Sequence, residues 1–465
     1  MSVEQKAAPP DPNDISQEEM RRNIFAMVWP ATIENVLQMA VGMVSSAMLG
    51  RVGAVAIGAV GLGRRITMLV WGFFAAIGTG TTVLVARSIG AKDRAKAGRY
   101  AEQAFFLALG MVLCVSILTF MFTRELLVLL YNTSGELLEV GTLYLRIAIW
   151  GVPFMAIMQI TSAIMRGAGN TKVPMQVATV INLVNVVLSY AFIFGHFGFK
   201  PMGVIGAAWA SNIAQAVGAL LAMYIMLYRQ DNLAFKLRGV RIVGDDVRAL
   251  LGIGLPTAAE NILMQLGQIM LTGLVVSFGS VALAAHQQGL TAESLSYMPA
   301  VGFSVAATAF VGQSMGAGST KLAERYVREL GKWSLILTAI TSSFLVFTPK
   351  LVFSILTDVP EVIDLGAYYL IMMGAAQIPQ QLTSVFNGAL RGAGDTKAPM
   401  VIGALGLWGI RLPFAYFFSL RLGWGIKGVW AAMTLDLFVR FAFSSLRFYR
   451  GRWKLELDRM ADAHA

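Results

Sequence analysis

The sequence predicts an all-α integral membrane protein with twelve transmembrane helices in two pseudo-symmetric lobes of six helices each. Three observations predict this fold class: long apolar runs, basic residues concentrated in alternate connections, and an internal repeat. Hydrophobic residues make up 56% of the 465 positions and charged residues only 14%, and the mean hydropathy is +0.65. Soluble proteins carry about 25% charged residues. The composition therefore indicates a polytopic membrane protein.

Twelve runs of mostly apolar residues are long enough to cross a membrane, because a helix of about 20 residues covers the hydrocarbon core. They lie near residues 24–49, 54–85, 100–122, 138–164, 173–195, 203–228, 249–277, 281–312, 327–348, 362–389, 398–420 and 426–446. The second and eighth runs are long and contain glycine or proline, which predicts that both helices are tilted or bent.

The chain begins with a polar segment, residues 1–23, that has no signal-peptide core. Within it, Ser16 is followed three residues later by Glu19, a capping-box pattern that predicts a helix start just before the first apolar run.

Lys and Arg residues are concentrated in the connections that lie on one side of the predicted membrane. The opposite set holds only Arg51, Arg124, Lys200, Lys350, Arg421 and Lys427. Basic residues mark the cytoplasmic side of a membrane protein, so we predict that both termini are cytoplasmic and that the number of spans is even. This topology accounts for the net charge of +11, and we expect no nucleic-acid partner.

An internal repeat relates the two halves of the chain. "MRGAGNTKVPM" from Met165 returns as "LRGAGDTKAPM" from Leu390, 225 positions later. Two further pairs, "WPATIEN" with "LPTAAEN" and "RSIGAKDRAKAGRY" with "QSMGAGSTKLAERY", lie 226 positions apart. Each repeat holds six spans, an even number, so both copies have the same orientation in the membrane.

These observations divide the chain into five segments. We predict a cytoplasmic N-terminal segment, an N-lobe with helices 1–6, a cytoplasmic linker, a C-lobe with helices 7–12 and a cytoplasmic tail. Their predicted ranges are 1–23, 24–228, 229–248, 249–448 and 449–465.

The repeated loop has a structural interpretation. Its glycines can end the fourth helix of each half in a left-handed conformation, at Gly167 and Gly169 or at Gly392 and Gly394. Pro174 or Pro399 then suits the first turn of the fifth helix. A phosphate-binding glycine loop is the alternative, but the full Walker pattern and a preceding strand are missing.

The motifs together resemble the multidrug and toxic compound extrusion (MATE) family over about residues 24–448. They are "LGRVGAVAIGA", "ARSIGAKDRAKA", "RGAGNTKVPMQVATVINLVN", "YAFIFG" followed by "GVIGAAWAS", "LSYMPAVGFSVAATAFVGQSMGAG" and "RGAGDTKAPM". The resemblance implies two six-helix lobes that form a V around a central cavity. It also implies export of organic, often cationic compounds, driven by inward flow of Na+ or H+.

The acidic residues that the family uses for ion coupling are replaced here. One branch of the family carries aspartates in the first and fifth helices, and these positions fall at Ser45 and Ser189. The other branch carries a glutamate in the seventh helix and an aspartate in the tenth, and these fall at Met264 and Gln380. The resemblance therefore assigns no coupling residue.

Four other acids lie within the predicted spans and are the ion-coupling candidates: Glu34, Glu260, Glu293 and Asp436. An acid at mid-membrane costs about 2.5–3.5 kcal/mol on insertion scales. A carboxylate can bind and release a proton or, together with neutral oxygens, Na+. We expect no other metal ion and no cofactor.

Glu34 and Glu260 occupy equivalent places, roughly 15 Å inside the first and seventh helices. Polar residues near them form stripes and are cavity or substrate candidates: Asn35, Gln38, Asn261 and Gln265. The alternative is that both glutamates hydrogen-bond across the lobe interface and hold helices together.

Glu293 has no acidic counterpart in the first half, and Tyr297 lies one turn further along. This asymmetry suits an ion or substrate site. An ion pair with Arg65, or with the neighbouring Arg64, is the alternative.

Asp436 lies one turn before Arg440, and Arg411 is its alternative partner, so we expect structural pairing there. Tyr297, Gln380, Arg65 and Arg411 complete the cavity candidates. His286 is expected to have a hydrogen-bonded packing role.

We predict a secondary exporter, an antiporter working by alternating access, that is monomeric and lies in a bacterial inner membrane. Its partners are a small organic substrate, H+ or Na+, and the lipid bilayer. A lipid or glycolipid flippase is one alternative, and the basic residues Arg64, Arg65 and Arg146 are the observation in its favour. A channel is another, although it would need rings of like groups. No GxSxG or HExxH motif predicts an enzyme.

Overall fold

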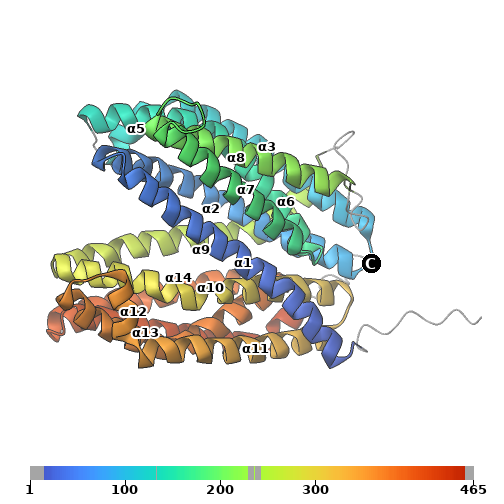
Figure 1. Cartoon of the computed structure of the whole chain (residues 1–465). Helices are drawn as coiled ribbons and strands as arrows, with labels where there is room; N and C mark the ends of the chain where they lie inside the picture. Colours follow the sequence, from blue (N-terminus) through green and yellow to red (C-terminus); the bar gives the residue numbers. More distant parts are fainter. Residues whose placement is uncertain (1–14, 132–133, 229–234, 236–241, 456–465) are drawn as a thin grey trace, which may run out of the picture. The chain divides into compact units, whose positions relative to one another are not determined.

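The computed structural model describes residues 15–131, 134–228, 235 and 242–455. In these residues every regular element is a helix (Figure 1). The first half contains α1 (Gln17–Gly50), α2 (Ala54–Gly90), α3 (Arg94–Met121), α4 (Thr123–Tyr131), α5 (Gly135–Ala148), η2 (Ile149–Gly151), α6 (Val152–Gly167), α7 (Lys172–Phe194) and α8 (Gly203–Tyr228). The second half contains α9 (Gly244–Val276), α10 (Ser280–Gly316), α11 (Thr320–Phe347), α12 (Pro349–Leu356), α13 (Pro360–Gly392), α14 (Lys397–Ala404), η3 (Leu405–Arg411), α15 (Leu412–Tyr416), η4 (Phe417–Arg421), α16 (Ile426–Tyr449) and η5 (Arg452–Lys454).

Ten helical segments in the described part of the chain are long and apolar enough to cross a membrane. α10 adds another if its two parts, which are bent by 48° between Ser294 and Ser296, form one span. α2, with 37 residues, completes the set of twelve. The predicted all-α membrane fold with twelve helices is thereby confirmed, and the predicted bend of the eighth helix is present.

The repeat is visible in the helix boundaries. α2 and α10 begin 226 positions apart and end 226 positions apart, and so do α3 and α11. The short helices α4 and α12, which the apolar runs did not predict, also begin 226 positions apart. Each follows the third long helix of its half, so the two halves share even their minor elements.

The repeated glycine loops have the predicted structure. α6 ends at Gly167 and α13 at Gly392, two residues before glycines with positive φ, Gly169 (84°) and Gly394 (83°). The next helices begin at Lys172 and Lys397 with a proline in their first turn. A glycine pays no Cβ penalty in the left-handed conformation, which accounts for its use at both helix ends.

α1 begins at Gln17, within the segment that the sequence assigned to the cytoplasm. The Glu19 amide donates to the Ser16 hydroxyl over 3.1 Å, as the capping pattern predicted. The helix therefore starts about seven residues before the apolar run, because polar first turns are satisfied outside the hydrocarbon.

The described residues form two compact units. Unit 1 comprises residues 15–29, 86–93 and 267–455, and unit 2 comprises residues 30–85 and the described residues of 94–266. The lobe boundaries 24–228 and 249–448 stay a prediction.

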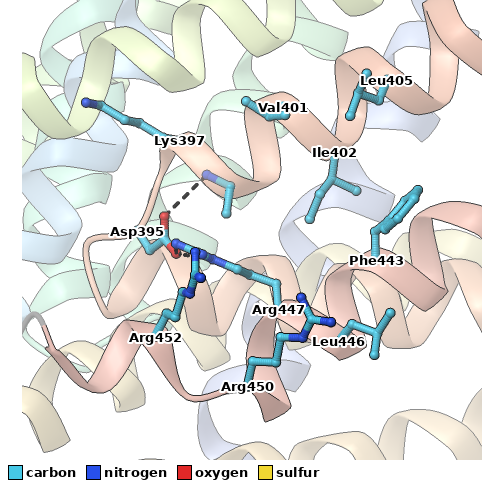
Figure 2. A pocket seen from close by; sticks show the side chains of 11 residues that line it. Asp395, Lys397, Val401, Ile402, Leu405, Phe443, Leu446, Arg447, Arg450 and Arg452 are labelled. Carbon is cyan, nitrogen blue, oxygen red and sulfur yellow. Dashed lines mark hydrogen bonds and ion pairs between the residues drawn. The ribbon is translucent and has the colours of Figure 1, made fainter.

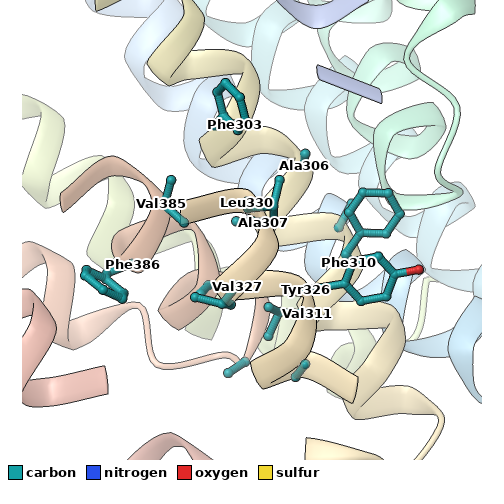
Figure 3. Close-up of a cluster of buried hydrophobic side chains, with 14 of the residues drawn as sticks. Phe303, Ala306, Ala307, Phe310, Val311, Tyr326, Val327, Leu330, Val385 and Phe386 are labelled. Atoms are coloured by element: carbon teal, nitrogen blue, oxygen red, sulfur yellow. The ribbon is translucent and has the colours of Figure 1, made fainter. Parts of the chain in front are cut away.

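The core of unit 1 is built where α10, α11 and α13 pack together (Figure 3). The rings of Phe310 and Tyr326 stack with centroids 4.5 Å apart, and fully buried alanines such as Ala306 and Ala307 bring the helices close. Small residues at helix contacts are how membrane helices gain van der Waals packing without a hydrophobic driving force between them.

Equivalent hydrogen bonds fix equivalent helices in the two units. In unit 2 the Thr82 hydroxyl donates to the Ala163 carbonyl over 3.0 Å, and in unit 1 the Thr308 hydroxyl donates to the Gly388 carbonyl over 3.0 Å. The pairs lie at repeat-related positions. The second long helix of each half is therefore joined to the fourth by an equivalent hydrogen bond.

Candidate functional site

Glu293 lies on α10 immediately before the bend between Ser294 and Ser296. Pro299 lies within the same helix, and a proline inside a helix removes a backbone hydrogen bond and bends the helix about one turn upstream. The position of the acid beside an interrupted helix turn follows from this local sequence.

Both carboxylate oxygens of Glu293 accept hydrogen bonds from α13. The Tyr369 hydroxyl donates to Oε2 over 2.5 Å, and the Gln377 side-chain amide donates to Oε1 over 3.1 Å. Glu293 is 7% exposed, Gln377 1% and Tyr369 0%. In the described residues no Lys or Arg forms an ion pair with Glu293. The hydrogen bonds to this buried carboxyl group thus come from neutral donors, while the charge of Arg411 acts on it from beyond ion-pair distance.

Two of the predicted cavity residues lie near this centre. The Gln377 amide also donates to the Gln380 side-chain oxygen over 3.4 Å, which links Gln380 to the Glu293 site. Tyr297 lies one turn after Glu293 on α10 and is half-buried. Glu293 and Gln380, named separately from the sequence, are therefore brought into one network.

An aromatic group extends the network on the other side of Tyr369. The Trp430 indole N–H donates to His286 Nδ1 over 3.3 Å, so the acceptor role of Nδ1 assigns the proton of neutral His286 to Nε2. The ring of Tyr369 meets both the His286 ring and the Trp430 ring edge-on, at centroid distances of 5.9 and 5.4 Å. These contacts are consistent with the hydrogen-bonded packing role predicted for His286, which stays a prediction, and they place its ring against Tyr369.

A second buried cluster joins Arg411, Asp436 and Arg440. Arg411 Nε donates to Asp436 Oδ2 over 2.7 Å, and Arg440 Nε donates to Asp436 Oδ1 over 2.6 Å. The Asp436 side chain is fully buried, and the side chains of the two arginines are less than 10% exposed. The structure thus brings together Asp436 and both of its predicted partners, and two cations surround one anion.

The local backbone makes room for this cluster. Arg411 ends the π-helical segment η3, and a Cβ at Gly406 in the same segment would overlap Asp436 and Arg440. π-helical turns inside α-helices often occur at functional sites. The absence of a side chain at Gly406 allows α16 to bring the two charged residues against η3.

In unit 2, Glu34 on α1 pairs with a residue of the repeated loop. Arg166 Nη2 donates to Glu34 Oε1 over 2.7 Å, and the Glu34 side chain is 5% exposed. This ion pair lies within one unit, so the observed partner differs from the expected contact across the lobe interface. The pairing favours a helix-holding role for Glu34, whose coupling role stays a prediction.

The other polar-stripe candidates are distributed along α1 and α9. Asn35 is half-buried and donates to the Ala31 carbonyl over 2.7 Å, while Gln38 is exposed. On α9, Glu260 and Asn261 are half-buried and Gln265 is exposed.

Of the positions that carry the family acids, Ser189 is buried, and Ser45 and Met264 are half-buried. The side chains of Arg64 and Arg65 lie outside the described part of the structure.

Sequence reasoning missed Tyr369 and Gln377, although both are polar residues in an otherwise apolar span. Their spacing along α13 could have marked a polar face that continues to Gln380. It also missed Arg166 as the partner of Glu34, since 132 positions separate the two residues. Within the described residues no group of three or more His, Cys, Asp and Glu side chains could hold a metal ion.

The chemistry of the Glu293 arrangement is that of a site for a small cation, and its ion-coupling role stays a prediction. An isolated carboxylate buried in protein is unfavourable unless it is neutralised or hydrogen-bonded. Tyr369 and Gln377 supply hydrogen bonds but no positive charge. A proton, or Na+ with the neutral oxygens nearby, is the species that would complete the site.

The fold and these buried polar centres define a multi-pass membrane protein. The MatE family model matches residues 30–191 and again residues 256–417, which are the two repeats at their offset of 226. The chain belongs to the MatE family.

Known proteins of similar sequence and structure support this assignment. The chain is 34% identical over 438 residues to a probable multidrug resistance protein NorM of Thermotoga maritima, covering 94% of each chain. It is 27% identical to the multidrug resistance protein MdtK of Yersinia pseudotuberculosis, covering 93% of this chain and 95% of that protein. A crystal structure described as MATE in the bent conformation matches with a TM-score of 0.87 at 20% identity, covering 95% of this chain and 97% of that one.

Proposed function

We propose that the protein is a multidrug exporter that moves organic, cationic compounds outward while H+ or Na+ flows inward, by alternating access. The multidrug names of the relatives NorM and MdtK support the substrate class. We also propose that the protein is a monomer in a bacterial inner membrane, a location supported by its bacterial relatives. The distribution of basic residues supports the placement of both termini in the cytoplasm.

Glu293 is the coupling residue of this proposal. The observation that carries it is the buried Glu293 carboxyl group, which is hydrogen-bonded by Tyr369 and Gln377 and has no Lys or Arg at ion-pair distance in the described residues. By contrast, Asp436 is bound by two arginines and Glu34 by one. A carboxylate that already has a permanent cationic partner binds a further cation less readily, because the partner repels it. Coupling roles for Glu34, Glu260 and Asp436 stay predictions beside it.

In the proposed transport cycle, the Glu293 site both binds the coupling cation and changes the relative stability of two conformations. With its cation bound, the Glu293 centre is neutral and stable in its buried surroundings. Loss of the cation leaves a charged carboxylate in a low-dielectric site, which favours a conformation in which water or a cationic substrate reaches it. Gradient energy is thereby converted into a difference in stability between two conformations.

The test is transport in sealed liposomes containing the purified protein. Ethidium serves as the organic cation, and a pH gradient or a Na+ gradient is imposed, one at a time. We expect one of the gradients to drive ethidium transport, and Glu293→Gln to reduce it to the level of protein-free liposomes. Glu361→Gln, which changes an exposed acid at the start of α13, is the matched control and should transport normally.

Other results would overturn the proposal. Gradient-driven transport by Glu293→Gln at the normal rate would remove Glu293 from the coupling step. Ethidium flux that follows only its own gradient would indicate a channel. Movement of a labelled phospholipid between leaflets, with no ethidium transport, would indicate the flippase alternative.

A further inference from the structure

A cavity of about 590 Å³ lies between α14 and α16 in unit 1 (Figure 2), and its lining includes none of the residues of the Glu293 site. It is found where α14 begins and α16 ends, which is one end of both membrane spans. Charged residues line it at that end, and apolar residues line it further along the two helices. They are Asp395, Lys397, Arg447, Arg450 and Arg452, followed by Val401, Ile402, Leu405, Phe443 and Leu446.

The charged end carries an excess of positive charge. Arg447 Nη2 lies 2.7 Å from Asp395 Oδ2, so this pair is internally balanced. Lys397, Arg450 and Arg452 are exposed, and in the part of the chain that the structure describes none of them forms an ion pair. Three cations around one opening are therefore available to an anionic group.

The turn that carries these arginines is fixed in place. Gly451, with φ of 69°, ends α16, and Trp453 folds back so that its indole N–H donates to the Phe448 carbonyl over 2.9 Å. Trp453 is buried and its ring stacks on that of Phe448. Lys454 pairs with Glu324 of α11 over 2.5 Å. Arg450 and Arg452 thus project from a rigid turn, which lowers the entropy cost of binding.

The remaining wall suits an acyl chain. Val401, Leu405, Phe443 and Leu446 are each about half exposed and belong to two neighbouring membrane helices. Lys397 and Leu405 are eight residues apart, which corresponds to about 12 Å along the helix axis. The hollow therefore leads from basic side chains at the level of the helix ends into the depth of the hydrocarbon.

Two arginines at the end of α16 have no basic counterpart at the aligned positions of the first half. When "GVIG" of α8 is aligned with "GIKG" of α16, Arg447 corresponds to Ile225 and Arg450 to Tyr228. These two arginines are thus additions to the second half that the repeated fold does not require, whereas Lys397 has a counterpart in Lys172.

We infer that this cavity binds an anionic phospholipid, with the phosphate at Lys397, Arg450 and Arg452 and an acyl chain along Val401, Leu405 and Phe443. Basic pockets between membrane helices on the cytoplasmic side bind anionic head groups, and the charge distribution predicts that this end is cytoplasmic. The chain's own residues 456–465 hold three acids and only two large apolar side chains, Leu457 and Met460, so they offer no continuous apolar segment to the wall. Free inorganic phosphate has no apolar part, so its binding would leave the apolar wall of the cavity exposed.

Native mass spectrometry of the full-length protein in detergent tests this inference with dioleoyl phosphatidylglycerol, dioleoyl phosphatidylcholine and inorganic phosphate. We expect tighter binding of phosphatidylglycerol than of phosphatidylcholine. A basic residue near an anionic lipid surface contributes about 1 kcal/mol, so R450Q/R452Q should weaken phosphatidylglycerol binding about thirtyfold. R450K/R452K should retain most of it, and K200Q/R421Q, which removes two exposed basic residues at other helix ends, is the matched control.

Three outcomes would overturn the inference. The first is equal binding of phosphatidylglycerol by R450Q/R452Q and the unchanged protein. The second is displacement of the bound lipid by inorganic phosphate at low millimolar concentration, which would assign the site to the free anion. The third is much stronger lipid binding after deletion of residues 456–465, which would make the chain's own tail the occupant.

Discussion

The Tyr369 hydroxyl donates a hydrogen bond to Glu293 Oε2 over 2.5 Å, and both side chains are buried. Tyr369 is itself held between the rings of His286 and Trp430. The donor therefore has a fixed direction, and the proposed coupling carboxylate depends on a residue of another helix. A substitution at Tyr369 should therefore alter the coupling step.

Tyr369→Phe removes this donor and keeps the aromatic ring. A hydrogen bond to a charged group contributes about 1.5–3 kcal/mol, so the concentration of the coupling ion at half-maximal transport should change about tenfold or more, and the rate should fall. Liposome transport measured over a series of pH or Na+ values gives this constant. Tyr368→Phe, at the neighbouring exposed tyrosine, is the control, and identical ion dependence in both variants would contradict the role of Tyr369.

A second expectation concerns the buried charges around Asp436. Asp436→Asn leaves Arg411 and Arg440 buried without their shared anion, and breaking a buried ion pair typically costs about 3–5 kcal/mol. We expect a large fall in the thermal unfolding midpoint of the detergent-solubilised protein.

The exposed pair of Lys350 and Asp364 provides the comparison for that measurement. Its two side chains lie 2.7 Å apart, and the hydrogen bond and charge of Asp364 raise the pKa of Lys350. Asp364→Asn should change the unfolding midpoint little, because exposed pairs are screened by solvent. Equal losses in Asp436→Asn and Asp364→Asn would show that the buried cluster does not stabilise the fold.

The roles of Glu34 and Arg166 can be separated by a double-mutant cycle. If the ion pair holds α1 to the end of α6, Glu34→Gln and Arg166→Gln should each lower stability, and the double variant should lose less than the sum. The expected interaction free energy is about 0.5–3 kcal/mol. Lys172→Gln, at an exposed position near the same loop, is the control. Loss of transport in Glu34→Gln with unchanged stability would instead support the predicted coupling role of Glu34.

The overall fold was accessible from the sequence because its determinants are local and additive. Apolar length predicts each span, and the offset of 226 predicts the two-lobe repeat. The short helices α4 and α12 were missed because nine and eight residues are too few to cross a membrane. The π-helical turn that ends at Arg411 was missed because its residues before Arg411 are all apolar or glycine, so the segment has no periodicity from which its geometry could be read.

The candidate site was only partly accessible from sequence. Glu293 and Asp436 could be named because an acid in an apolar span is rare. The different surroundings of these two acids could not be predicted, because their partners lie far along the chain. These partners are Tyr369 and Gln377 for Glu293, and Arg411 for Asp436. Spacing predicts which residues share a helix face but not which face of a distant helix meets them.

The glycines of η3 allow a matched test of how the Asp436 cluster is accommodated. Gly406→Ala places a Cβ against Asp436 and Arg440, whereas a Cβ at Gly409, three residues later, meets no atom within 4 Å. Overpacking a tightly packed site costs about 1–3 kcal/mol, so Gly406→Ala should lower the thermal unfolding midpoint. Gly409→Ala should leave it unchanged or raise it, since replacing a helical glycine with alanine stabilises by about 0.5–1 kcal/mol. If both variants unfolded at the same temperature, close packing of the cluster against Gly406 would be refuted.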